Sequence, residues 1–399
     1  MRPMPPLLSV DEALARVLAC ARPLGSERVA VAAAAGRILA TDVLARVDLP
    51  PFASSAMDGY ALRAAETPGR LPVGFRIAAG KPAQRALEPG EAMAISTGAA
   101  VPTGADAVVP LELVVEYGNE IEVPAVEIGA NIRPVGGDVR AGAVVLSAGA
   151  VVGAPQIGAL AASGAAELEV ARRPRVVVVS TGTELRAPGE ALGAGQIYES
   201  NGPMIAAALE AAGADVERIG PVADDEQAHR SVLERGLEAD VLVSSGGVSV
   251  GPHDLVRNIL RELRVVEEFW GVAVRPGKPL AFGTRADTLV FGLPGNPVSA
   301  LVGVELFVRP ALLALQGASS PGPHYELGRL ASPLRRNSAR DSLARARTSR
   351  GEEGTSLEPL GGQDSHMIVR AAVADALVFV PAGEGEVAAG EVVRYLRLA

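Results

Sequence analysis

The chain of 399 residues carries a formal net charge of −9, with 48% hydrophobic and 21% charged residues, and its length exceeds the ~250–300 residues at which a single core stops growing, so we expect several domains. The acidic balance argues against a nucleic-acid surface, and a single cysteine, Cys20, excludes a disulfide framework and a cysteine-rich metal site. The sequence shows neither a basic-then-apolar leader nor a run of ~18 apolar residues, so we expect a cytoplasmic protein without a membrane segment.

The N-terminal part predicts a helix followed by a small, mostly β region. Ser9-Val-Asp-Glu12 has the spacing of a capping box and precedes apolar residues at helical spacing. Residues 29–40 predict a strand and a short helix. From 45 to 140 the chain is rich in Pro and Gly and has short alternating segments, which is typical of β structure. Within this stretch Asp58, before Gly59, predicts a simple turn when it is considered by itself.

The next stretch, residues 141–172, is rich in Ala and predicts helix, with a strand over 165–172 that leads into a new domain. From 175 to 300, four β-branched runs end abruptly in Gly, Ser, Thr or Pro. Such runs predict buried parallel strands, and helical patterns lie between them. The residues at the ends of these runs are Ser180-Thr181-Gly182-Thr183-Glu184, Ser244-Ser245-Gly246-Gly247-Val248-Ser249, Arg275-Pro-Gly-Lys-Pro279 and Gly292-Leu-Pro-Gly-Asn-Pro297.

The helices between these strands have recognisable ends. Asn201 predicts the N-cap of a helix over 203–212. Further helices are predicted over 226–237 and 254–263. Pro297–Leu315 predicts a long apolar helix that Pro310 interrupts. Because ligands of open α/β sheets bind beyond the carboxyl ends of the strands, we expect the binding site at the loops named above.

The Gly/Ser loop over 244–251 precedes the helix that begins near Asp254, and this arrangement predicts an anion site. The loop matches neither the dinucleotide nor the ATP fingerprint. Carboxylates beside an anion, here Glu184, Asp224, Asp225 and Asp254, indicate a bridging divalent cation, and oxygen ligands suit Mg²⁺. A tight strand-to-helix turn without a ligand is the alternative interpretation.

Lysine is rare in this chain, which has only Lys81 and Lys278. Lys278 lies between Gly277 and Pro279 in a predicted strand-end loop of a chain that otherwise uses Arg. A compact ammonium that contacts phosphate explains this choice better than a solvated surface lysine does. After a linker-like stretch over 317–323, the short alternating segments that end the chain predict a small β-barrel-like module.

Five motifs in this order resemble one family, the molybdopterin molybdenumtransferases, which include the bacterial enzyme and the related E domain of gephyrin. The resemblance covers essentially the whole chain. The motifs are Ser-Ala-Met-Asp-Gly-Tyr at 55–60, Ser-Thr-Gly-Thr-Glu-Leu at 180–185, Ser-Gly-Gly-Val-Ser-Val-Gly-x-x-Asp at 245–254, Pro-Gly-Lys-Pro at 276–279 and Gly-Leu-Pro-Gly-Asn-Pro-Val-Ser at 292–299.

The resemblance implies a multidomain fold of the α/β plus β class. Its expected parts are a helical linker region over 1–45 and 141–172, a small β region over 46–140, a parallel-sheet α/β molybdopterin-binding domain over 173–316 and a C-terminal β-barrel-like domain over 322–399. Members of the family use Mg²⁺ and molybdate to convert adenylylated molybdopterin, release AMP and leave molybdenum on the dithiolene sulfurs. They form homodimers whose composite active sites lie between the α/β domain of one subunit and the β region of the other.

The resemblance also implies site residues, position by position. Catalytic roles fall on Asp58, Thr97, Asp138 and Glu184, with Asp58 and Glu184 as metal residues. The substrate-binding positions are Thr181, Gly182, Asp224, Ser245, Gly246, Gly247, Ser249, Asp254, Arg275, Lys278, Pro294 and Pro297.

Three positions depart from the family pattern. Gly271 and Arg275 stand where relatives often carry lysine, and Gly137 stands where glutamate is frequent. Two alternative functions therefore stay open. One is a molybdopterin-binding scaffold without turnover, which Gly271 favours. The other is molybdopterin adenylyltransferase, which shares the Gly/Ser loops but lacks the β region and the C-terminal domain.

Overall fold

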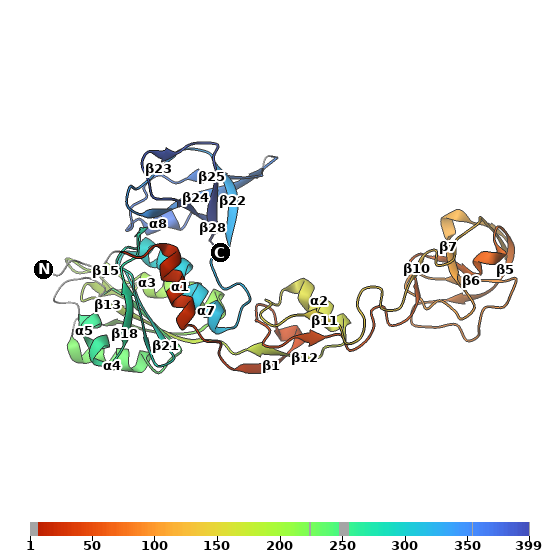
Figure 1. Ribbon diagram of the computed structural model, residues 1–399, viewed down its shortest axis with the longest axis horizontal. Helices are drawn as coiled ribbons and strands as arrows, with labels where there is room; N and C mark the ends of the chain where they lie inside the picture. Colours follow the sequence, from red (N-terminus) through yellow and green to blue (C-terminus); the bar gives the residue numbers. More distant parts are fainter. Residues whose placement is uncertain (1–6, 223–224, 247–254, 353, 399) are drawn as a thin grey trace.

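The computed structural model describes residues 7–222, 225–246, 255–352 and 354–398. The molecule is elongated (Figure 1), with a small β region at one end and an α/β domain beside a C-terminal β domain at the other. A slim linker region joins them, and the chain passes through it twice, once on the way to the β region and once on the way back. The predicted multidomain α/β plus β fold is confirmed.

The first helix, α1 (Val10–Cys20), begins at the predicted capping box. Ser9 Oγ accepts a hydrogen bond from the Glu12 N–H at 3.2 Å, and the Ser9 N–H donates to Glu12 Oε2 at 2.9 Å, so two otherwise unpaired groups of the first turn are satisfied. The buried face of α1, at Val10, Ala13 and Val17, packs into the core of the α/β domain. The N-terminal helix therefore stabilises the α/β domain directly.

The α/β domain is built on a six-stranded sheet with the strand order β16-β13-β17-β21-β20-β18. The first four strands are parallel to one another. Strand β20 pairs antiparallel with β21, and β18 pairs antiparallel with β20, so β18 again runs in the direction of the first four. Three of the four β-branched runs thus form parallel strands as predicted. The strand bounds are β13 Arg175–Thr181, β16 Asp215–Val222, β17 Val241–Ser245, β18 Val266–Trp270, β20 Ala281–Arg285 and β21 Thr288–Leu293.

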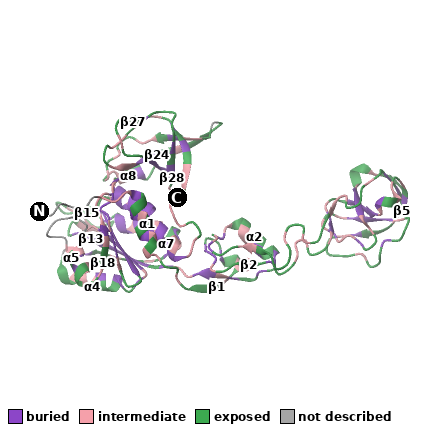
Figure 2. Ribbon diagram, viewed as in Figure 1, coloured by how far each residue is buried: buried purple, intermediate pink, exposed green. Residues whose placement is uncertain are grey.

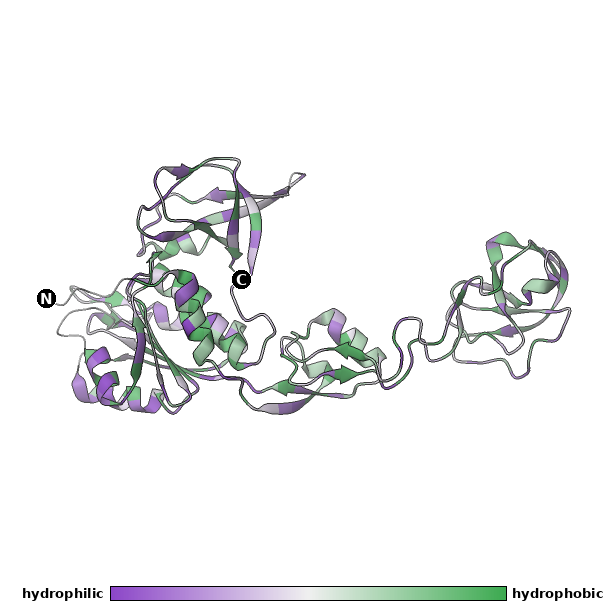
Figure 3. Cartoon of the chain, in the orientation of Figure 1, coloured by the Kyte–Doolittle hydropathy of each residue, from purple (hydrophilic) through white to green (hydrophobic). Residues whose placement is uncertain are grey.

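Helices cover both faces of this sheet, because successive residues of a strand point to opposite faces. Along β17, Val241 and Val243 pack against α1, α3 (Asn201–Ala211) and the helices after β21. Leu242 packs on the other face, against α4 (Glu226–Gly236) and α5 (Leu255–Glu262). Figure 2 shows the buried strands between these helices, and Figure 3 shows the hydrophilic outer faces of α4 and α5.

The predicted role of Asn201 as an N-cap is wrong. Ser200 occupies the N-cap position of α3, and Asn201 is the first helical residue. Its side chain hydrogen-bonds across to two other loops, which are far away in sequence, and therefore does not cap its own helix. By contrast, Asp225 caps α4, since its Oδ1 accepts a hydrogen bond from the Ala228 N–H at 2.8 Å.

The run Pro297–Leu315 forms one helical rod of three parts: α6 (Pro297–Gly303), a π-helical turn (Val304–Val308) and α7 (Arg309–Leu315). Pro310 therefore does not break the helix, since the wider π turn precedes it and accommodates the lost hydrogen bond. This segment is long and apolar enough to cross a membrane, but 72% of it is buried inside the protein. It has the burial of a core helix.

The fourth β-branched run is not part of the parallel sheet, so that prediction is wrong. Gly271, with φ +89°, turns the chain after β18, and the short strand β19 (Val274–Arg275) pairs in parallel with β24 of the C-terminal domain. Its place in the α/β sheet is taken by the β20–β21 hairpin. Arg275 consequently lies at the boundary between the two domains.

The C-terminal domain is a closed β-barrel, as predicted. Strand β24 pairs with both β25 and β26, and β22 and β28 complete the ring, so these strands leave no open edge. A short helix, α8 (Ile368–Ala371), precedes β26. The strand bounds are β22 Tyr325–Leu330, β23 Leu334–Arg335, β24 Asp341–Gly351, β25 Gly354–Pro359, β26 Ala376–Val380, β27 Glu386–Val387 and β28 Val392–Arg397.

The linker region pairs segments from both passages of the chain, β1 (Ser26–Ala30) with β12 (Glu167–Ala171) and β2 (Val43–Leu44) with β11 (Val144–Leu146). The helix predicted for 141–164 is confined to α2 (Ala154–Ala162), because the residues before it pair with the outgoing passage. The β region is a sheet of order β7-β4-β6-β5-β9-β8. Its strands are β4 Gly59–Leu62, β5 Gly69–Ile77, β6 Ala92–Ile95, β7 Ala107–Pro110, β8 Val115–Tyr117 and β9 Glu120–Val123.

Candidate active site

Three loops meet at the carboxyl ends of β13, β17 and β21. Thr181 and Ser245 are both buried there, and Gly246 has φ +92°. A Cβ atom on Gly246 would lie 2.9 Å from the Thr181 carbonyl oxygen, and one on Gly295 would lie 4.0 Å from the Gly246 Cα. The loops approach so closely that Gly246 cannot carry a side chain. The predicted substrate-binding residues Thr181, Gly182, Ser245, Gly246 and Pro294 therefore gather in one place.

The beginning of α3 ties these loops together, and sequence reasoning missed this role. Asn201 Nδ2 donates to Ser245 Oγ at 2.8 Å and to the Gly295 carbonyl at 2.7 Å. The buried Glu199 carboxylate accepts from Ser180 Oγ at 3.2 Å and from the N–H of the first turn of α3 at 2.6 Å. One short segment thus contacts the ends of all three strands. The sequence signal that could have indicated this role is the run of three adjacent polar residues, Glu199-Ser200-Asn201, directly before a Gly-Pro pair.

Glu184 lies at the edge of this cluster and is exposed. Its carboxylate folds back over Gly182. A Cβ atom on Gly182 would lie only 2.7 Å from both Glu184 carboxylate oxygens. Gly182 also has φ +151°, which favours glycine. A carboxylate thus stands beside the loops, and the metal-binding role of Glu184 stays a prediction.

Arg275 borders a separate cavity of about 640 Å³ between β19 and the C-terminal barrel. Arg335, Arg336 and Ser342 also line it, so three arginine residues line one hollow. Sequence reasoning selected Arg275 but missed the residues of the barrel, because nothing local in the chain indicates that β24 and β19 are neighbours. Lys278 is half-buried in the turn that follows β19.

Pro297 begins α6, and the first turn of this helix contacts the C-terminal domain. The Val298 N–H donates to the Ser365 carbonyl at 3.1 Å. The loop that carries Ser365 is held by the buried Arg345, whose guanidinium donates to the carbonyls of Gly362, Asp364 and Met367. The Gly-Asn-Pro loop after β21 is therefore supported by both domains.

Three of the predicted catalytic residues lie away from these loops. Asp58 and Thr97 are exposed neighbours in the β region, and Asp58 Oδ1 accepts a hydrogen bond from the Thr97 N–H at 3.0 Å. Burial, followed by a hydrogen bond to Glu116, raises the pKa of nearby Tyr60 to about 12, so this phenol stays protonated. Asp138 is exposed where the β region meets the linker, and its N–H donates to the Leu49 carbonyl at 2.9 Å.

Within one chain, the structure does not bring Asp58 and Glu184 together, since they belong to regions at opposite ends of the molecule (Figure 1). Among the residues that the structure describes, no group of three or more His, Cys, Asp or Glu side chains is arranged to hold a metal ion. Four predicted substrate-binding residues, Asp224, Gly247, Ser249 and Asp254, lie outside the described residues.

Comparison with known proteins places this geometry in a family. Residues 8–164 match the model of the MoeA N-terminal region (domain I and II), residues 177–314 match a probable molybdopterin binding domain, and residues 328–398 match the MoeA C-terminal region (domain IV). A relative from Mycobacterium tuberculosis strain H37Rv, molybdopterin molybdenumtransferase 2, is 39% identical over 391 residues, which cover 94% of this chain and 95% of the relative. The chain belongs to the MoeA family.

Other members agree with this assignment. Molybdopterin molybdenumtransferase of Haemophilus influenzae is 34% identical and covers 97% of this chain and 98% of its own length. The molybdopterin biosynthesis MoeA protein of Pyrococcus horikoshii OT3 has a TM-score of 0.85 at 28% identity and covers 98% of this chain and 100% of its own. A second structure of a molybdopterin biosynthesis MoeA protein from Pyrococcus has a TM-score of 0.79 at 31% identity over 98% of this chain. The resemblance that the motifs indicated is confirmed.

Gly271, which the motifs marked as an expected departure from the family pattern, has a structural explanation. Gly271 has φ +89°, a conformation that side chains other than Gly disfavour, and a Cβ atom there would lie 2.7 Å from Leu7 Cδ2. The glycine is therefore required by the local turn. Arg275, four residues later, faces the cavity that the barrel arginines share.

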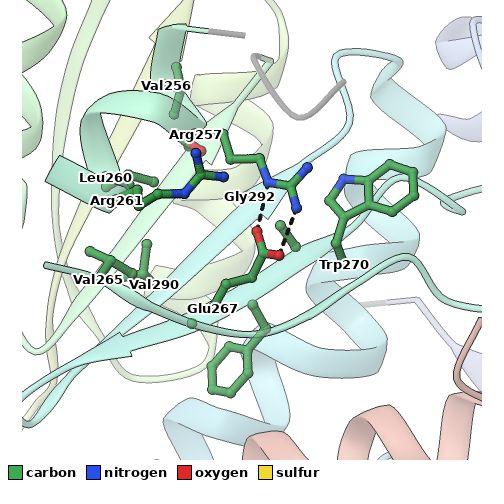
Figure 4. A pocket seen from close by; sticks show the side chains of 13 residues that line it. Val256, Arg257, Leu260, Arg261, Val265, Glu267, Trp270, Val290 and Gly292 are labelled. Carbon is green, nitrogen blue, oxygen red and sulfur yellow. Dashed lines mark hydrogen bonds and ion pairs between the residues drawn. The ribbon is translucent and has the colours of Figure 1, made fainter. Parts of the chain in front are cut away.

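A second cavity, of about 140 Å³, lies between α5 and the MoeA-type sheet (Figure 4). This face of the sheet is opposite to the one that α3 covers. Helix α5 forms one wall, and β18, β20 and β21 form the floor. Arg257 and Glu267 face each other across it through two hydrogen bonds of 2.7 Å, and Trp270 stands beside them. Ser244 reaches this cavity, whereas its neighbour Ser245 points to Asn201. The sequence patterns did not single out this hollow.

Proposed function

We propose that this chain inserts molybdenum from molybdate into adenylylated molybdopterin and releases AMP. The observation that carries the proposal is the match to molybdenumtransferases along almost the entire chain, combined with a Gly/Ser loop cluster at the expected edge of the sheet. In this reaction a molybdate oxygen, or a water that molybdate positions, attacks the phosphorus of the adenylyl group. The bond from this phosphorus to the molybdopterin oxygen breaks, so molybdopterin is the leaving group and the adenylyl phosphorus keeps the attacking oxygen. With water as the nucleophile the product is AMP, and with a molybdate oxygen it is adenylyl molybdate, which water hydrolyses to AMP and molybdate. Molybdenum binds the two dithiolene sulfurs while their two protons and one molybdate oxygen leave as water.

The charge distribution supports this chemistry. Molybdate and the phosphoryl groups are anions, and transfer requires that their oxygens be neutralised. Arg275, Arg335 and Arg336 line one cavity, which is a suitable place for an oxyanion, because guanidinium groups bind such oxygens in pairs. Lys278 lies three residues from Arg275 and adds a fourth cation nearby.

The shape of the chain supports a composite site in a homodimer. Asp58 and Thr97 are presented at the surface of the β region, and two exposed apolar side chains, Phe52 and Met57, accompany them. Exposed apolar residues beside a fixed carboxylate are typical of a surface that another chain covers. The α/β domain of a partner subunit is the cover that we propose, so that each active site draws on two chains.

Asp58 and Glu184 are the residues that we propose for Mg²⁺. Both carboxylates are exposed, and oxygen donors of this kind suit the ion. When bound, Mg²⁺ would supply charge neutralisation at the phosphoryl oxygens. We propose no other cofactor, no nucleic acid and no membrane partner, and a cytoplasmic location.

The two alternatives find less support. A molybdopterin adenylyltransferase needs neither the β region nor the C-terminal barrel, and both are present here. A scaffold without turnover was favoured by Gly271, but the positive φ gives this glycine a conformational reason, so Gly271 does not by itself support the scaffold.

The proposal is tested by incubating the protein with adenylylated molybdopterin, Mg²⁺ and molybdate and measuring AMP. We expect AMP release that depends on molybdate, stops with a chelator and returns when Mg²⁺ is added. Binding of the substrate without AMP release would instead support the scaffold. Formation of adenylylated molybdopterin from ATP would support the adenylyltransferase.

A further inference from the structure

Two serines occupy equivalent positions at the ends of neighbouring strands. Ser180 of β13 and Ser245 of β17 are partners in the register of the sheet. Both are buried, at 4% and 3% exposure, and both hydrogen-bond to the segment that begins α3. The partner differs, since Ser180 contacts the Glu199 carboxylate and Ser245 contacts the Asn201 amide.

The two partners impose opposite directions on the hydroxyl groups. A carboxylate oxygen accepts, so the Ser180 proton is donated to Glu199, at 3.2 Å. An amide nitrogen only donates, so Ser245 Oγ is the acceptor of the 2.8 Å hydrogen bond from Asn201. The orientation of the Asn201 amide is fixed, because its nitrogen also contacts the Gly295 carbonyl at 2.7 Å, and a carbonyl cannot donate. The Ser245 proton is therefore left for another acceptor.

That acceptor is missing from the described part of the chain. No described residue receives a hydrogen bond from Ser245, and the Asn201 Oδ1 atom beside it is buried without a partner. Buried polar groups are almost always paired, and exceptions mark places that a ligand or water completes. Asn201 itself is 8% exposed, so its free oxygen belongs to the interior of the loop cluster.

We infer that Asn201 is a positioning residue that turns the Ser245 hydroxyl into a hydrogen-bond donor for the substrate. The inference rests on the proposed function, because the acceptor is an oxygen of the phosphoryl groups of adenylylated molybdopterin. An anionic oxygen accepts a stronger hydrogen bond than a neutral one. Ser180, whose proton is already donated to Glu199, cannot make this contact.

The substitution Asn201→Asp tests the direction of the hydrogen bond at almost constant size. Aspartate can only accept, so the Ser245 proton would turn to it and be lost to the substrate, as at Ser180. A negative charge in the first turn of α3 is favourable for the helix, but the aspartate loses the hydrogen bond to the Gly295 carbonyl, so urea unfolding of the variant is measured beside its affinity. Asn201→Ala serves as the second variant if Asn201→Asp does not fold, which circular dichroism would show.

The measurement is the affinity for adenylylated molybdopterin, determined by calorimetry for each variant and for the double variant. We expect Ser245→Ala and Asn201→Asp each to weaken binding by roughly tenfold or more, the usual effect of one charge-assisted hydrogen bond. Since Asn201 acts through Ser245, the two losses of affinity should not multiply. The double variant should bind within about twofold of the weaker-binding single variant. The matched control is Ser163→Ala, a buried serine of the linker region whose hydroxyl donates to the Leu160 carbonyl at 2.8 Å, and this variant should stay within about twofold of the parent.

Losses that multiply in the double variant would overturn the inference, because Asn201 would then act independently of Ser245. An Asn201→Asp protein that binds like the parent would overturn it as well. A parent protein that binds no adenylylated molybdopterin would overturn the proposed function together with the inference. A parent that binds and releases AMP, with multiplying losses in the variants, would leave the proposed function standing and remove the inference only.

Discussion

The Asp58 carboxylate accepts a hydrogen bond from the Thr97 backbone N–H at 3.0 Å, and this contact fixes two turns of the β region against each other. Both residues are exposed at the surface of a region that lies far from the α/β domain of its own chain. The presentation of an acidic group to the outside is the feature on which the proposed composite site depends.

Mixed dimers test that site. Asp58→Ala and Glu184→Ala homodimers should each be nearly inactive, whereas unfolding and refolding an equal mixture should restore roughly a quarter of the parent activity, since half of the dimers are mixed and each has one intact site. The readout is AMP release per dimer. If the mixture stays as inactive as the two variants, although mass spectrometry confirms mixed dimers, the composite site between two subunits is excluded.

The lysine after β19 gives a second prediction with a built-in control. Lys278→Ala should weaken binding of adenylylated molybdopterin by about 1–3 kcal/mol, the typical effect of a charge-assisted contact, with no change in the unfolding temperature. Lys81→Ala removes the other lysine, which is exposed in the β region, and should leave the affinity unchanged. Equal affinities for the two variants would contradict a role of Lys278 in binding.

Gly271 gives a third prediction, about stability. Gly271→Ala should lower the free energy of unfolding by about 1–2 kcal/mol, because the left-handed backbone disfavours a Cβ atom and Leu7 stands in its way. Gly271→Lys should be destabilised by a similar amount and gain no activity. Urea unfolding and AMP release measure the two effects. A stable and more active lysine variant would contradict this structural explanation of Gly271.

The fourth prediction concerns pH and the ion pair between Arg172 and Asp240, whose two hydrogen bonds measure 2.8 Å each. Burial raises the pKa of Asp240, but the hydrogen bonds from Arg172 and from the Arg175 N–H outweigh this and lower the pKa below its usual value. Because the pKa of Asp240 is lower in the folded than in the unfolded protein, its ionised carboxylate stabilises the fold at every pH above the unfolded pKa of about 3.9. This stabilisation is lost as the pH falls through the pKa of the folded state.

Asp240→Asn should therefore lower the free energy of unfolding at pH 7 by about 1–3 kcal/mol, with the lower part of this range favoured because Arg172 is partly exposed. The difference between variant and parent should shrink as the pH falls below about 4. Urea unfolding of both proteins between pH 3 and 7 measures it. A difference that does not change with pH would mean that the variant loses packing and not charge.

The sequence by itself determined the local elements. The capping box joins Ser9 and Glu12, which are only three residues apart, so whether it forms does not depend on residues far away in the chain. The runs at 176–179, 241–243 and 289–291 became buried parallel strands, because β-branched apolar residues in short runs need cover on both faces. The motifs also identified the family, because each one is weak by itself but five of them in a fixed order are specific.

The tertiary structure decided which of these pieces are neighbours. The run that ends at Arg275 has the same composition as the other strands, but it pairs with β24 of the barrel and so places Arg275 among arginines that follow it by about sixty residues. Asn201 is a residue type that often caps helices, yet its amide nitrogen donates to Ser245 and Gly295. These hydrogen bonds to loops that are close in space replace the bond that a cap would make with its own helix. Such contacts join residues far apart in the chain. They depend on how the whole sheet packs, and no local pattern carries that information.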